Sequence, residues 1–342
     1  MDKPTVDLRI VSLIPSATEI VAKLGYGDYL VGRSHECDFP ASVQALPICT
    51  SPKFDPVGTS RQIHERVSEL LISALSVYKV DTDLLTLLRP THIITQAQCE
   101  VCAVSLSDVE QAVTDLASAK SVEQTPIKVI SLQPQRLADV WTDMARVAIA
   151  LDPEQANLTI ATVVDPLRSR LPLHLSSSEH SAQAIAQTVQ PQTKQPQTKH
   201  PQTKQSQPKV VCIEWSDPLM AAGNWVPELV TLAGGTDICG KAGEHSDWMS
   251  WEALKAADPD IIIVMPCGYD LAQTRQATTE MAAHSDWHSL KAVQNNRVYL
   301  TDGNQYFNRP GPRLVESYEI LAEIIQHKAV SHQRQPLGWE RF

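Results

Sequence analysis

The sequence predicts an α/β protein with two Rossmann-like lobes, each built on a parallel sheet, that are joined by a long α-helical connector and interrupted by a disordered PQTK-repeat insert. Three observations predict this architecture. Both halves of the chain open with the same strand–helix pattern, a low-complexity stretch separates the halves, and a long amphipathic helical pattern precedes that stretch. Strands that alternate with helices form parallel sheets covered on both faces, so two matching halves indicate two such lobes.

The first half begins with a short apolar strand at residues 9–14, which is followed by an amphipathic helix. Ser16 and Glu19 have the spacing of a capping box at the start of this helix, and Gly25 suits the position after its last turn. A helix that ends at Pro90 then leads into a second buried strand. This order of elements predicts the first parallel sheet.

The second half repeats the pattern. A strand at residues 209–214 is followed by a helix around residues 227–232 that ends at Gly234, and Pro259 precedes the next buried strand at residues 261–264. The likeness between the halves predicts a ligand cleft between two similar lobes, and this inference needs no knowledge of any family.

The stretch between the halves has two parts. Apolar residues at helical spacing run from Leu137 to Leu167 and predict a single long connector, which Pro166 kinks or ends. Residues 191–204 then contain Pro-Gln-Thr-Lys three times without an aliphatic or aromatic residue, and such a segment cannot bury enough surface to become ordered. The predicted segments are an N-terminal lobe (1–133), a helical connector (134–174), a disordered insert without function of its own (175–208), a C-terminal lobe (209–330) and a tail (331–342).

Composition excludes several classes of protein. The 342 residues include 29 Lys and Arg against 39 Asp and Glu, a net charge of −10, which argues against nucleic acid or an anionic membrane as a partner. The N-terminus has no apolar signal region, and no apolar run approaches the ~20 residues that span a bilayer. We therefore expect a cytoplasmic protein, unless the sequence is trimmed from a periplasmic precursor. Seven cysteines then indicate thiols or metal ligands rather than disulfides.

In open α/β sheets, ligands bind beyond the carboxyl ends of the strands, and this rule selects the loops that carry aromatic side chains in the second half. Such side chains suit a flat or bulky ligand, whereas ordinary loop packing is the alternative for each of them. The aromatic residues in these loops are Trp215, Trp225, Trp248, Tyr306 and Phe307.

A second cluster points to metal chemistry. His35, Cys37, Cys99 and Cys102 could form a Cys₃His zinc site if their two loops meet, and His245 or Cys267 of the other lobe could complete a site. Alternatively, the cysteines pack as small apolar side chains.

Recognised catalytic motifs are missing from the sequence. It contains no phosphate-binding glycine loop and no G-x-S-x-G elbow, and the zinc-deaminase motif fails at Cys37 and at Gln98. We therefore assign no catalytic residue and do not expect an enzyme. Ser16 could help an anion to bind at a helix N-terminus, or it is a plain capping residue.

The sequence resembles the periplasmic binding proteins for vitamin B12 and iron–siderophore complexes, which consist of two Rossmann-like lobes joined by a long helix. The resemblance covers roughly residues 9–327 without the insert. The segments that carry it are residues 10–19, 31–34, 38–40, 90–95, 223–235, 251–264, 307–309 and 312–313.

The likeness is closest to the cobalamin-binding type. It implies that Arg309 is the pocket arginine, that Ser246–Trp248 is the aromatic region of lobe two, and that Glu252 docks on a transporter. The first-lobe docking glutamate has Glu100 as its nearest match. Where that type places aromatic residues in lobe one, this chain has Glu36, Gln96 and Ser131.

These observations predict a monomeric small-molecule binding protein that holds a corrinoid or a related metal chelate between its lobes, requires no cofactor, and has an ABC-transporter permease as a partner by resemblance alone. The alternatives are a transition-metal protein or metalloenzyme that uses the histidine and cysteine loops, and a regulatory or scaffold protein that kept the fold. The predicted ligand-binding residues are Ser16, His35, Glu36, Gln96, Gln98, Trp215, Met220, Trp225, His245, Trp248, Tyr306, Phe307 and Arg309.

Overall fold

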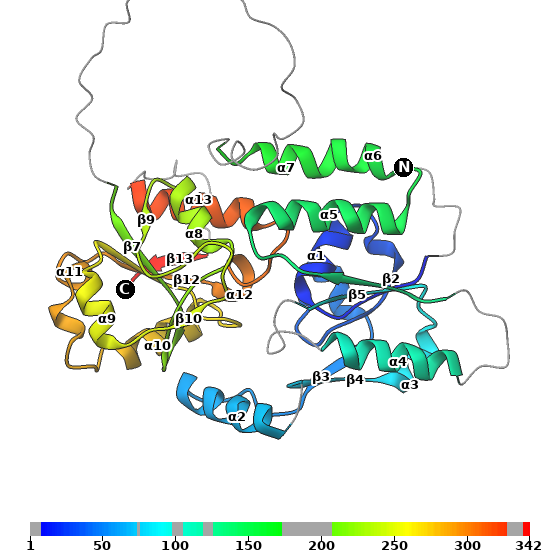
Figure 1. The fold of residues 1–342 in the computed structure, drawn as a ribbon, viewed down its shortest axis with the longest axis horizontal. Coiled ribbons are helices and arrows are strands. Elements are labelled where there is room, and N and C mark those ends of the chain that lie inside the picture. Colours follow the sequence, from blue (N-terminus) through cyan, green and yellow to red (C-terminus); the bar gives the residue numbers. More distant parts are fainter. Residues whose placement is uncertain (1–7, 74–75, 98–104, 119–125, 173–206, 327–337) are drawn as a thin grey trace, which may run out of the picture.

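The fold is taken from a computed structural model, which describes residues 8–73, 76–97, 105–118, 126–172, 207–326 and 338–342. Two sheets lie in two lobes, and helical rods run along one side of both (Figure 1). The two Rossmann-like lobes and the helical connector that the sequence predicts are therefore present. The predicted disorder of the insert concerns residues that lie almost entirely outside the described ranges, and it stays a prediction.

Lobe one contains a four-stranded sheet in which every pairing is parallel, with the order β2-β1-β5-β6. Its strands are short, and the two inner strands β1 and β5 are fully buried, because helices cover both faces. An antiparallel hairpin, β3–β4, stands beside this sheet. The strands are β1 (Ile10–Ser12), β2 (Leu30–Arg33), β3 (Thr50–Pro52), β4 (Tyr78–Val80), β5 (His92–Gln96) and β6 (Lys128–Leu132), and the helices are α1 (Pro15–Lys23), η1 (Gly27–Tyr29), η2 (Ala41–Ala45), α2 (Ser60–Ser73), α3 (Thr82–Leu88) and α4 (Leu106–Ser118).

Lobe two contains a seven-stranded sheet whose central strands β7, β11 and β12 are parallel, as predicted, while its edge strands β8, β10 and β13 are antiparallel. A two-residue connection joins β7 to β8, and so short a connection permits only an antiparallel pair. The strands are β7 (Lys209–Ser216), β8 (Leu219–Ala221), β9 (Thr236–Asp237), β10 (Asp247–Trp248), β11 (Ile261–Val264), β12 (Val298–Thr301) and β13 (Trp339–Arg341).

The chain end differs from the prediction of a tail over residues 331–342. Strand β13 pairs with β12, Trp339 packs against Tyr299, and Glu340 forms an ion pair with Arg275. Three residues with one aromatic anchor are too short a pattern to read as a strand. The helices of lobe two are α8 (Val226–Leu232), α9 (Trp251–Ala257), α10 (Leu271–Met281), η5 (Trp287–Ser289), α11 (Lys291–Gln294), α12 (Gly303–Tyr306) and α13 (Leu314–Gln326).

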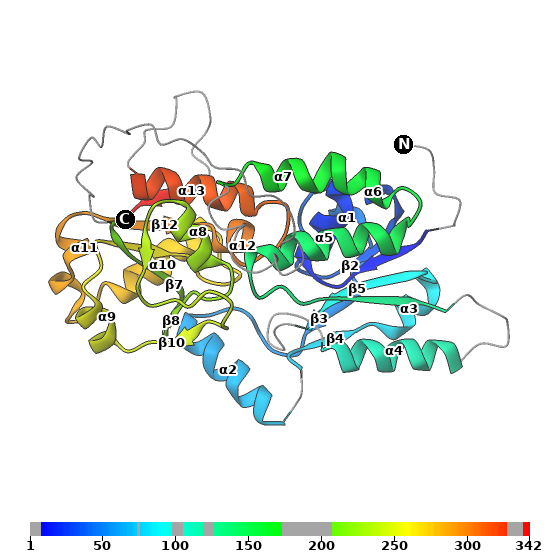
Figure 2. The ribbon, with the colours of Figure 1, turned by 45° about the horizontal axis from the view of Figure 1, so that its top comes forward.

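The connector is not the single long helix that the sequence predicts but two consecutive helical rods that lie side by side (Figure 2). The first is α5 (Leu137–Leu151), and the second runs through α6 (Ala156–Thr159), the π-helical turn η3 (Ile160–Val164) and α7 (Asp165–Ser169). The first rod ends before Asp152 because Pro153 follows it, and the residue before a proline disfavours helical geometry. The second rod continues past Pro166, which we expected to kink or end it. The wider π-helical turn directly before Pro166 relieves the loss of its backbone donor.

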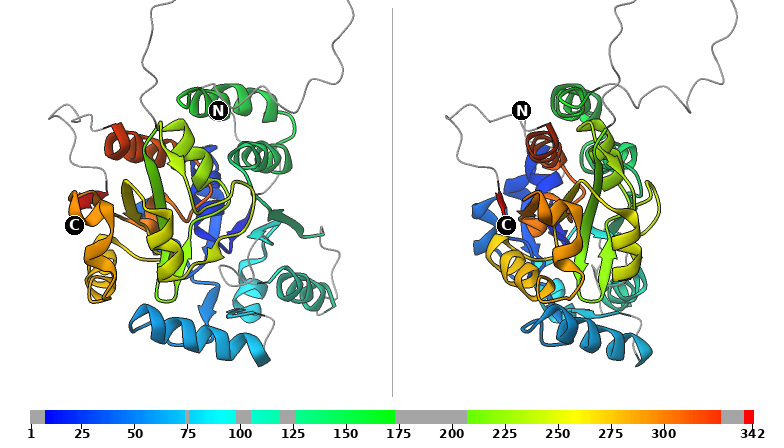
Figure 3. Two further views of the ribbon diagram at one scale, coloured as in Figure 1. Left: turned by 60° about the vertical axis from the view of Figure 1, so that its left-hand side comes forward. Right: turned by 90° about the vertical axis from the view of Figure 1, so that its left-hand side faces the viewer.

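Buried apolar residues join the lobes on the connector side. One cluster extends from β1 and α1 through α5 and α7 to α8 and α13, and it includes Ile20, Met144, Leu167 and Leu321. Two further clusters fill the far face of each sheet. The lobes therefore share an apolar core along the connector, whereas α2 lies on the opposite side of the molecule (Figure 3). Within the described ranges, no helix has the length and apolar character needed to cross a membrane.

Candidate ligand-binding interface between the lobes

A buried ion-pair cluster joins the carboxyl-end loops of the two lobes. Arg309 follows α12 in lobe two, and its side chain is 4% exposed. Its guanidinium donates to both carboxylate oxygens of Asp38 at 2.5 and 3.1 Å, to Glu19 Oε1 at 3.1 Å and to Asn304 Oδ1 at 2.9 Å. Asp38 and Glu19 belong to lobe one, so these bonds cross between the lobes.

Arg313 extends the same cluster. Its Nε donates to Glu19 Oε2 at 2.8 Å, and its guanidinium lies 4.4 Å above the centre of the Phe39 ring. Glu19 thus accepts from two arginines while its side chain is only 1% exposed. Removing one partner from a buried ion pair typically costs 3–5 kcal/mol, because a desolvated charge is left unpaired. This contact therefore resists separation of the lobes.

Arg309, which the resemblance assigns to ligand binding, is already paired with carboxylates of the protein itself. Burial raises the pKa of Asp38, but the hydrogen bond and charge of Arg309 outweigh it and lower that pKa overall. Asp38 is consequently ionised at neutral pH, and it holds Arg309 through both oxygens. In this structure Arg309 contacts a carboxylate of its own chain.

A second contact between the lobes lies at the other side of the interface, at the start of α2. Ser60 Oγ lies 2.6 Å from Ser216 Oγ and 3.2 Å from the hydroxyl of Tyr269. Arg61 donates to both carboxylate oxygens of Asp217 at 2.5 and 2.9 Å. All three of these partners of α2 belong to lobe two.

Trp248 also takes part in this second contact. Its ring is 55% exposed and meets His64 of α2 edge to face, with ring centres 5.0 Å apart. Next to it in the sheet, Met220 pairs with Trp248 across β8 and β10, and Trp215 packs against Tyr269 at 5.4 Å. These side chains form a half-buried apolar face of lobe two where α2 reaches it.

Two other aromatic residues with predicted ligand contacts pack in the core instead. Trp225 and Phe307 are buried, and the indole of Trp225 donates to the carbonyl of Phe307 at 3.1 Å. Tyr306 is half-buried beneath Arg313, and its carbonyl accepts from the Ser317 hydroxyl. Trp225 and Phe307 therefore pack as ordinary buried loop residues, which was the alternative to ligand contact.

In lobe one, His35 and Glu36 follow β2 and meet the β3–β4 hairpin. His35 Nδ1 lies 2.8 Å from the Thr50 hydroxyl, which itself donates to Ser34, so the ring nitrogen acts as the donor. Burial, with a smaller effect from Arg33, lowers the pKa of His35 and favours a neutral ring. Burial also raises the pKa of Glu36, although the Tyr78 hydroxyl donates to its carboxylate at 3.2 Å.

Several polar side-chain oxygens near the carboxyl ends of β1, β5 and β6 are buried without a hydrogen-bond partner among the described residues. Ser16 Oγ lies at the start of α1, Gln96 Oε1 at the end of β5, and Ser131 Oγ in β6, where Ser131 pairs with Thr95. A buried polar atom without a partner costs free energy, which a polar ligand or water would recover. Ser16 has no capping bond, because Ile14 is the residue before the helix.

The proposed metal site has two members in the described chain. Cys37 is buried, accepts from the Thr18 hydroxyl at 3.0 Å, and has a pKa raised to about 11 by burial. Without a metal, its sulfur is therefore a protonated thiol that packs as a small apolar side chain. Cys99 and Cys102 lie outside the described residues, as do Gln98 and Glu100. The described ranges hold no group of three potential metal ligands.

Two predicted residues lie at the surface of lobe two. Glu252 is exposed in the first turn of α9. His245 is exposed, and its Nδ1 lies 2.9 Å from the carbonyl of Ser246, whose hydroxyl donates to Glu214. His245 and His35 are not joined by any contact that the structure shows.

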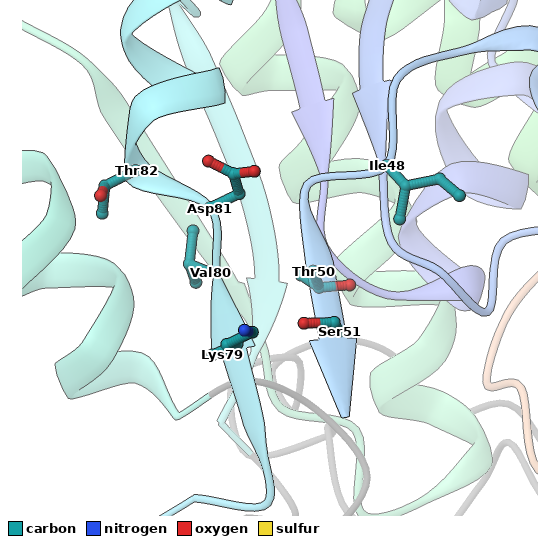
Figure 4. A pocket seen from close by; sticks show the side chains of 7 residues that line it. All are labelled: Ile48, Thr50, Ser51, Lys79, Val80, Asp81 and Thr82. Atoms are coloured by element: carbon teal, nitrogen blue, oxygen red, sulfur yellow. The ribbon is translucent and has the colours of Figure 1, made fainter. Parts of the chain in front are cut away.

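A surface pocket of about 460 Å³ lies on lobe one (Figure 4). It opens along β3 and β4, and Asp81 at its rim accepts from the backbone of Leu84 as the cap of α3. None of the predicted ligand-binding residues lines it. The lining residues are Ile48, Thr50, Ser51, Lys79, Val80, Asp81 and Thr82.

The sequence did not reveal the residues that connect the lobes. Glu19 has the spacing of a capping box, yet it pairs with arginines about 290 positions away, and Ser60, Arg61 and His64 carry no motif. The sequence offered one indication of the Glu19 contact. Glu19 directly precedes the apolar residues Ile20 and Val21 of α1, and a glutamate on the buried face of a helix needs a partner.

Sequence comparison finds a family at the second lobe. The sequence model of the periplasmic binding protein family matches residues 174–305. A Bacillus subtilis (strain 168) protein described as the uncharacterized ABC transporter substrate-binding lipoprotein YvrC is 23% identical over 326 residues, which cover 93% of this chain and 79% of that protein.

Solved structures with the same fold cover almost the entire chain at low identity. The periplasmic vitamin B12 binding protein BtuF of Vibrio cholerae has a TM-score of 0.56 at 17% identity, covering 93% of this chain and 96% of that chain. A periplasmic heme-binding protein from Pseudomonas aeruginosa has a TM-score of 0.59 at 19% identity, covering 94% of each chain. A possible iron-binding (periplasmic solute-binding) protein from Staphylococcus epidermidis has a TM-score of 0.58 at 19% identity, covering 93% and 98%.

Proposed function

Because this chain resembles the ABC-transporter substrate-binding proteins in sequence and has the fold of periplasmic binding proteins, we propose that it binds a corrinoid or a related metal chelate between its lobes. The observation that carries the proposal is the meeting of the two carboxyl edges: the loop after β2 contacts Arg309, and α2 contacts the loop after β7. Ligands of open α/β sheets bind at such edges.

The side chains at these edges support a flat, partly polar ligand. Lobe two offers the apolar face of Trp215, Met220 and Trp248, and lobe one offers buried oxygens that lack partners. Similar proteins are named for vitamin B12, heme and iron, which are all metal-centred ligands. The ligand contacts we propose are therefore Ser16, His35, Glu36, Gln96, His245, Trp215, Met220, Trp248 and Tyr306.

His35 fits a metal-centred ligand. Its Nδ1 donates to Thr50, so Nε2 of the neutral ring carries the lone pair that metals bind. Arg309 becomes a ligand contact only where a ligand carboxylate replaces Asp38. Because Arg309 pairs with Asp38, the uncharged face of Trp248 matters more to affinity than this arginine does.

Glu252 supports a docking role. It is exposed at the start of α9, on the surface of lobe two, and its replacement by alanine should leave ligand affinity unchanged. A measured loss of binding to a permease, with ligand affinity intact, is the result expected of a transporter-docking residue.

The test is a titration of the purified protein with cyanocobalamin, dicyanocobinamide and hemin, followed by absorption and by thermal stabilisation. We expect one of them to bind, and Trp248→Ala to weaken that binding about tenfold, the loss of ~1.4 kcal/mol. Phe342→Ala is the matched control, since Phe342 is an exposed aromatic residue that packs on Trp287. No binding of any of the three ligands, or equal effects of the two variants, would contradict the proposal.

A further inference from the structure

Helix α2 bridges the two lobes. Its second half is anchored in lobe one, where Val67 and Leu70 pack against the buried cluster under the sheet. Its first two turns lie against lobe two, through Ser60, Arg61 and His64. One rigid helix therefore contacts two bodies that are otherwise joined on the opposite, connector side (Figure 3).

The helix and the loop before it form one braced unit. The backbone N–H of Lys53 donates to the carbonyl of Val77 at 2.8 Å. The chain therefore leaves for α2 and returns from it at the same place, at the base of the β3–β4 hairpin. Arg66 donates to the carbonyls of Asp55 and Val57 at 2.8 and 2.6 Å, and this holds the loop against the helix. Movement between the lobes should therefore occur at the lobe-two end of α2 and not within the unit.

The contacts at that end are mostly polar. The Arg61–Asp217 pair is exposed to solvent, with side chains 59% and 44% exposed, and exposed pairs contribute little to stability. The Ser60 hydroxyl adds hydrogen-bond contacts with the hydroxyls of Ser216 and Tyr269, and the His64 ring contacts Trp248. On the connector side, by contrast, the lobes share a continuous apolar cluster and the buried arginines.

We propose that α2 is a clasp: its first two turns release lobe two and rejoin it, while the lobes stay packed along the connector. A ligand that binds between the lobes would enter on this side. That role in ligand entry rests on the proposed function, whereas the opening itself does not.

The opening is tested by thiol labelling of S60C in the full chain, followed by mass spectrometry of each cysteine peptide. Ser60 is buried against lobe two, so a reagent reaches the introduced thiol only when the clasp opens. R61D and D217R should each speed labelling about fivefold, and R61D/D217R together should restore the slow rate. R275E is the matched control, because Arg275 and Glu340 form a solvent-exposed pair within lobe two, with side chains 48% and 34% exposed.

The buried thiol of Cys212 distinguishes local opening from unfolding. A clasp predicts that Cys212 stays unlabelled while the introduced thiol reacts. Four results would overturn the proposal. The first two are that the thiol of S60C alone reacts as fast as in an unfolded chain, or that R61D leaves its labelling rate unchanged. The other two are that R61D/D217R fails to restore the slow rate, or that the labelling of Cys212 speeds up in parallel.

Ligand entry is tested with S60C/S216C, because the two native hydroxyl oxygens lie 2.6 Å apart, close enough for a disulfide to replace them. Oxidation should slow association of hemin or cyanocobalamin at least tenfold, and dithiothreitol should restore it. Equal rates before and after reduction would show that the clasp does not control entry. Binding of neither probe by the reduced protein would contradict the proposed function, while the labelling rates would still decide whether α2 opens.

Discussion

The buried ion-pair cluster and the contact of α2 with lobe two both join the lobes, and they differ in burial and in strength. At one, Glu19, Arg309 and Arg313 are buried and bonded in a network beside an apolar core. At the other, Arg61 and Asp217 pair in solvent beside a few hydroxyl groups. Buried ion pairs cost several kcal/mol to break, whereas exposed pairs contribute about 0–1 kcal/mol. The same two lobes therefore have a durable contact, the buried ion-pair cluster, and a reversible contact, the exposed pair at α2.

The largest effect should come from the durable contact. Glu19→Ala leaves two nearly buried arginines without their shared carboxylate, so we expect the free energy of unfolding to fall by about 3–5 kcal/mol. Urea denaturation measures the change. Glu340→Ala, which removes an exposed pair with Arg275, is the control and should cost less than about 1 kcal/mol. A loss below about 1 kcal/mol in Glu19→Ala would remove the distinction between the two contacts.

A smaller effect should follow from Asp38, which is half-exposed at the rim of the same network. A carboxyl whose pKa is lowered on folding contributes stability that is present above its ordinary pKa of 3.8 and is lost as the pH falls through its folded value. Asp38→Asn should therefore lower stability at pH 7 by about 1–2 kcal/mol and flatten its decline below pH 4. Unfolding measured from pH 7 to pH 3 would contradict this if both proteins declined equally.

The reversible contact should respond less. Arg61→Ala removes an exposed bidentate pair, so the free energy of unfolding should fall by less than about 1 kcal/mol. The same urea series measures it. A loss as large as that of Glu19→Ala would mean that α2 is part of the permanent junction and not a clasp.

The smallest effect should come from Glu36, two positions before Asp38, and its sign should be opposite. Burial raises the pKa of Glu36, so its contribution to stability is present below its ordinary pKa of 4.5 and is lost as the pH rises through the folded value. Glu36→Gln should therefore change stability at pH 7 by no more than about 0.5 kcal/mol, in the stabilising direction. A clear destabilisation at pH 7 in the same unfolding assay would show that the ionised carboxylate is needed.

Sequence patterns predicted the parts of this molecule that repeat or alternate. Strand–helix alternation located both parallel sheets, and apolar periodicity located α5, because burial on one face leaves a readable period. The antiparallel edge strand β13 and the continuous helix past Pro166 were missed, since a single aromatic contact and a local π-helical turn leave no period.

The site was less predictable than the fold. The strand-end loops that the sequence selects for ligand binding include Arg309, which contacts the other lobe. Burial separated Trp225 and Phe307 from the exposed Trp248 only once the packing was known. Contacts such as Arg309 with Asp38 join residues 271 positions apart, and one sequence contains no signal for that distance. Resemblance placed Arg309 near the interface but did not reveal that Asp38 occupies it.

The most direct test of the account is hydrogen exchange of the backbone with and without the chelate that binds best. A ligand between the lobes should protect residues 34–38 of lobe one and residues 215–220 and 245–248 of lobe two together. Protection confined to residues 48–52 and 79–82, around the surface pocket of lobe one, would contradict the account.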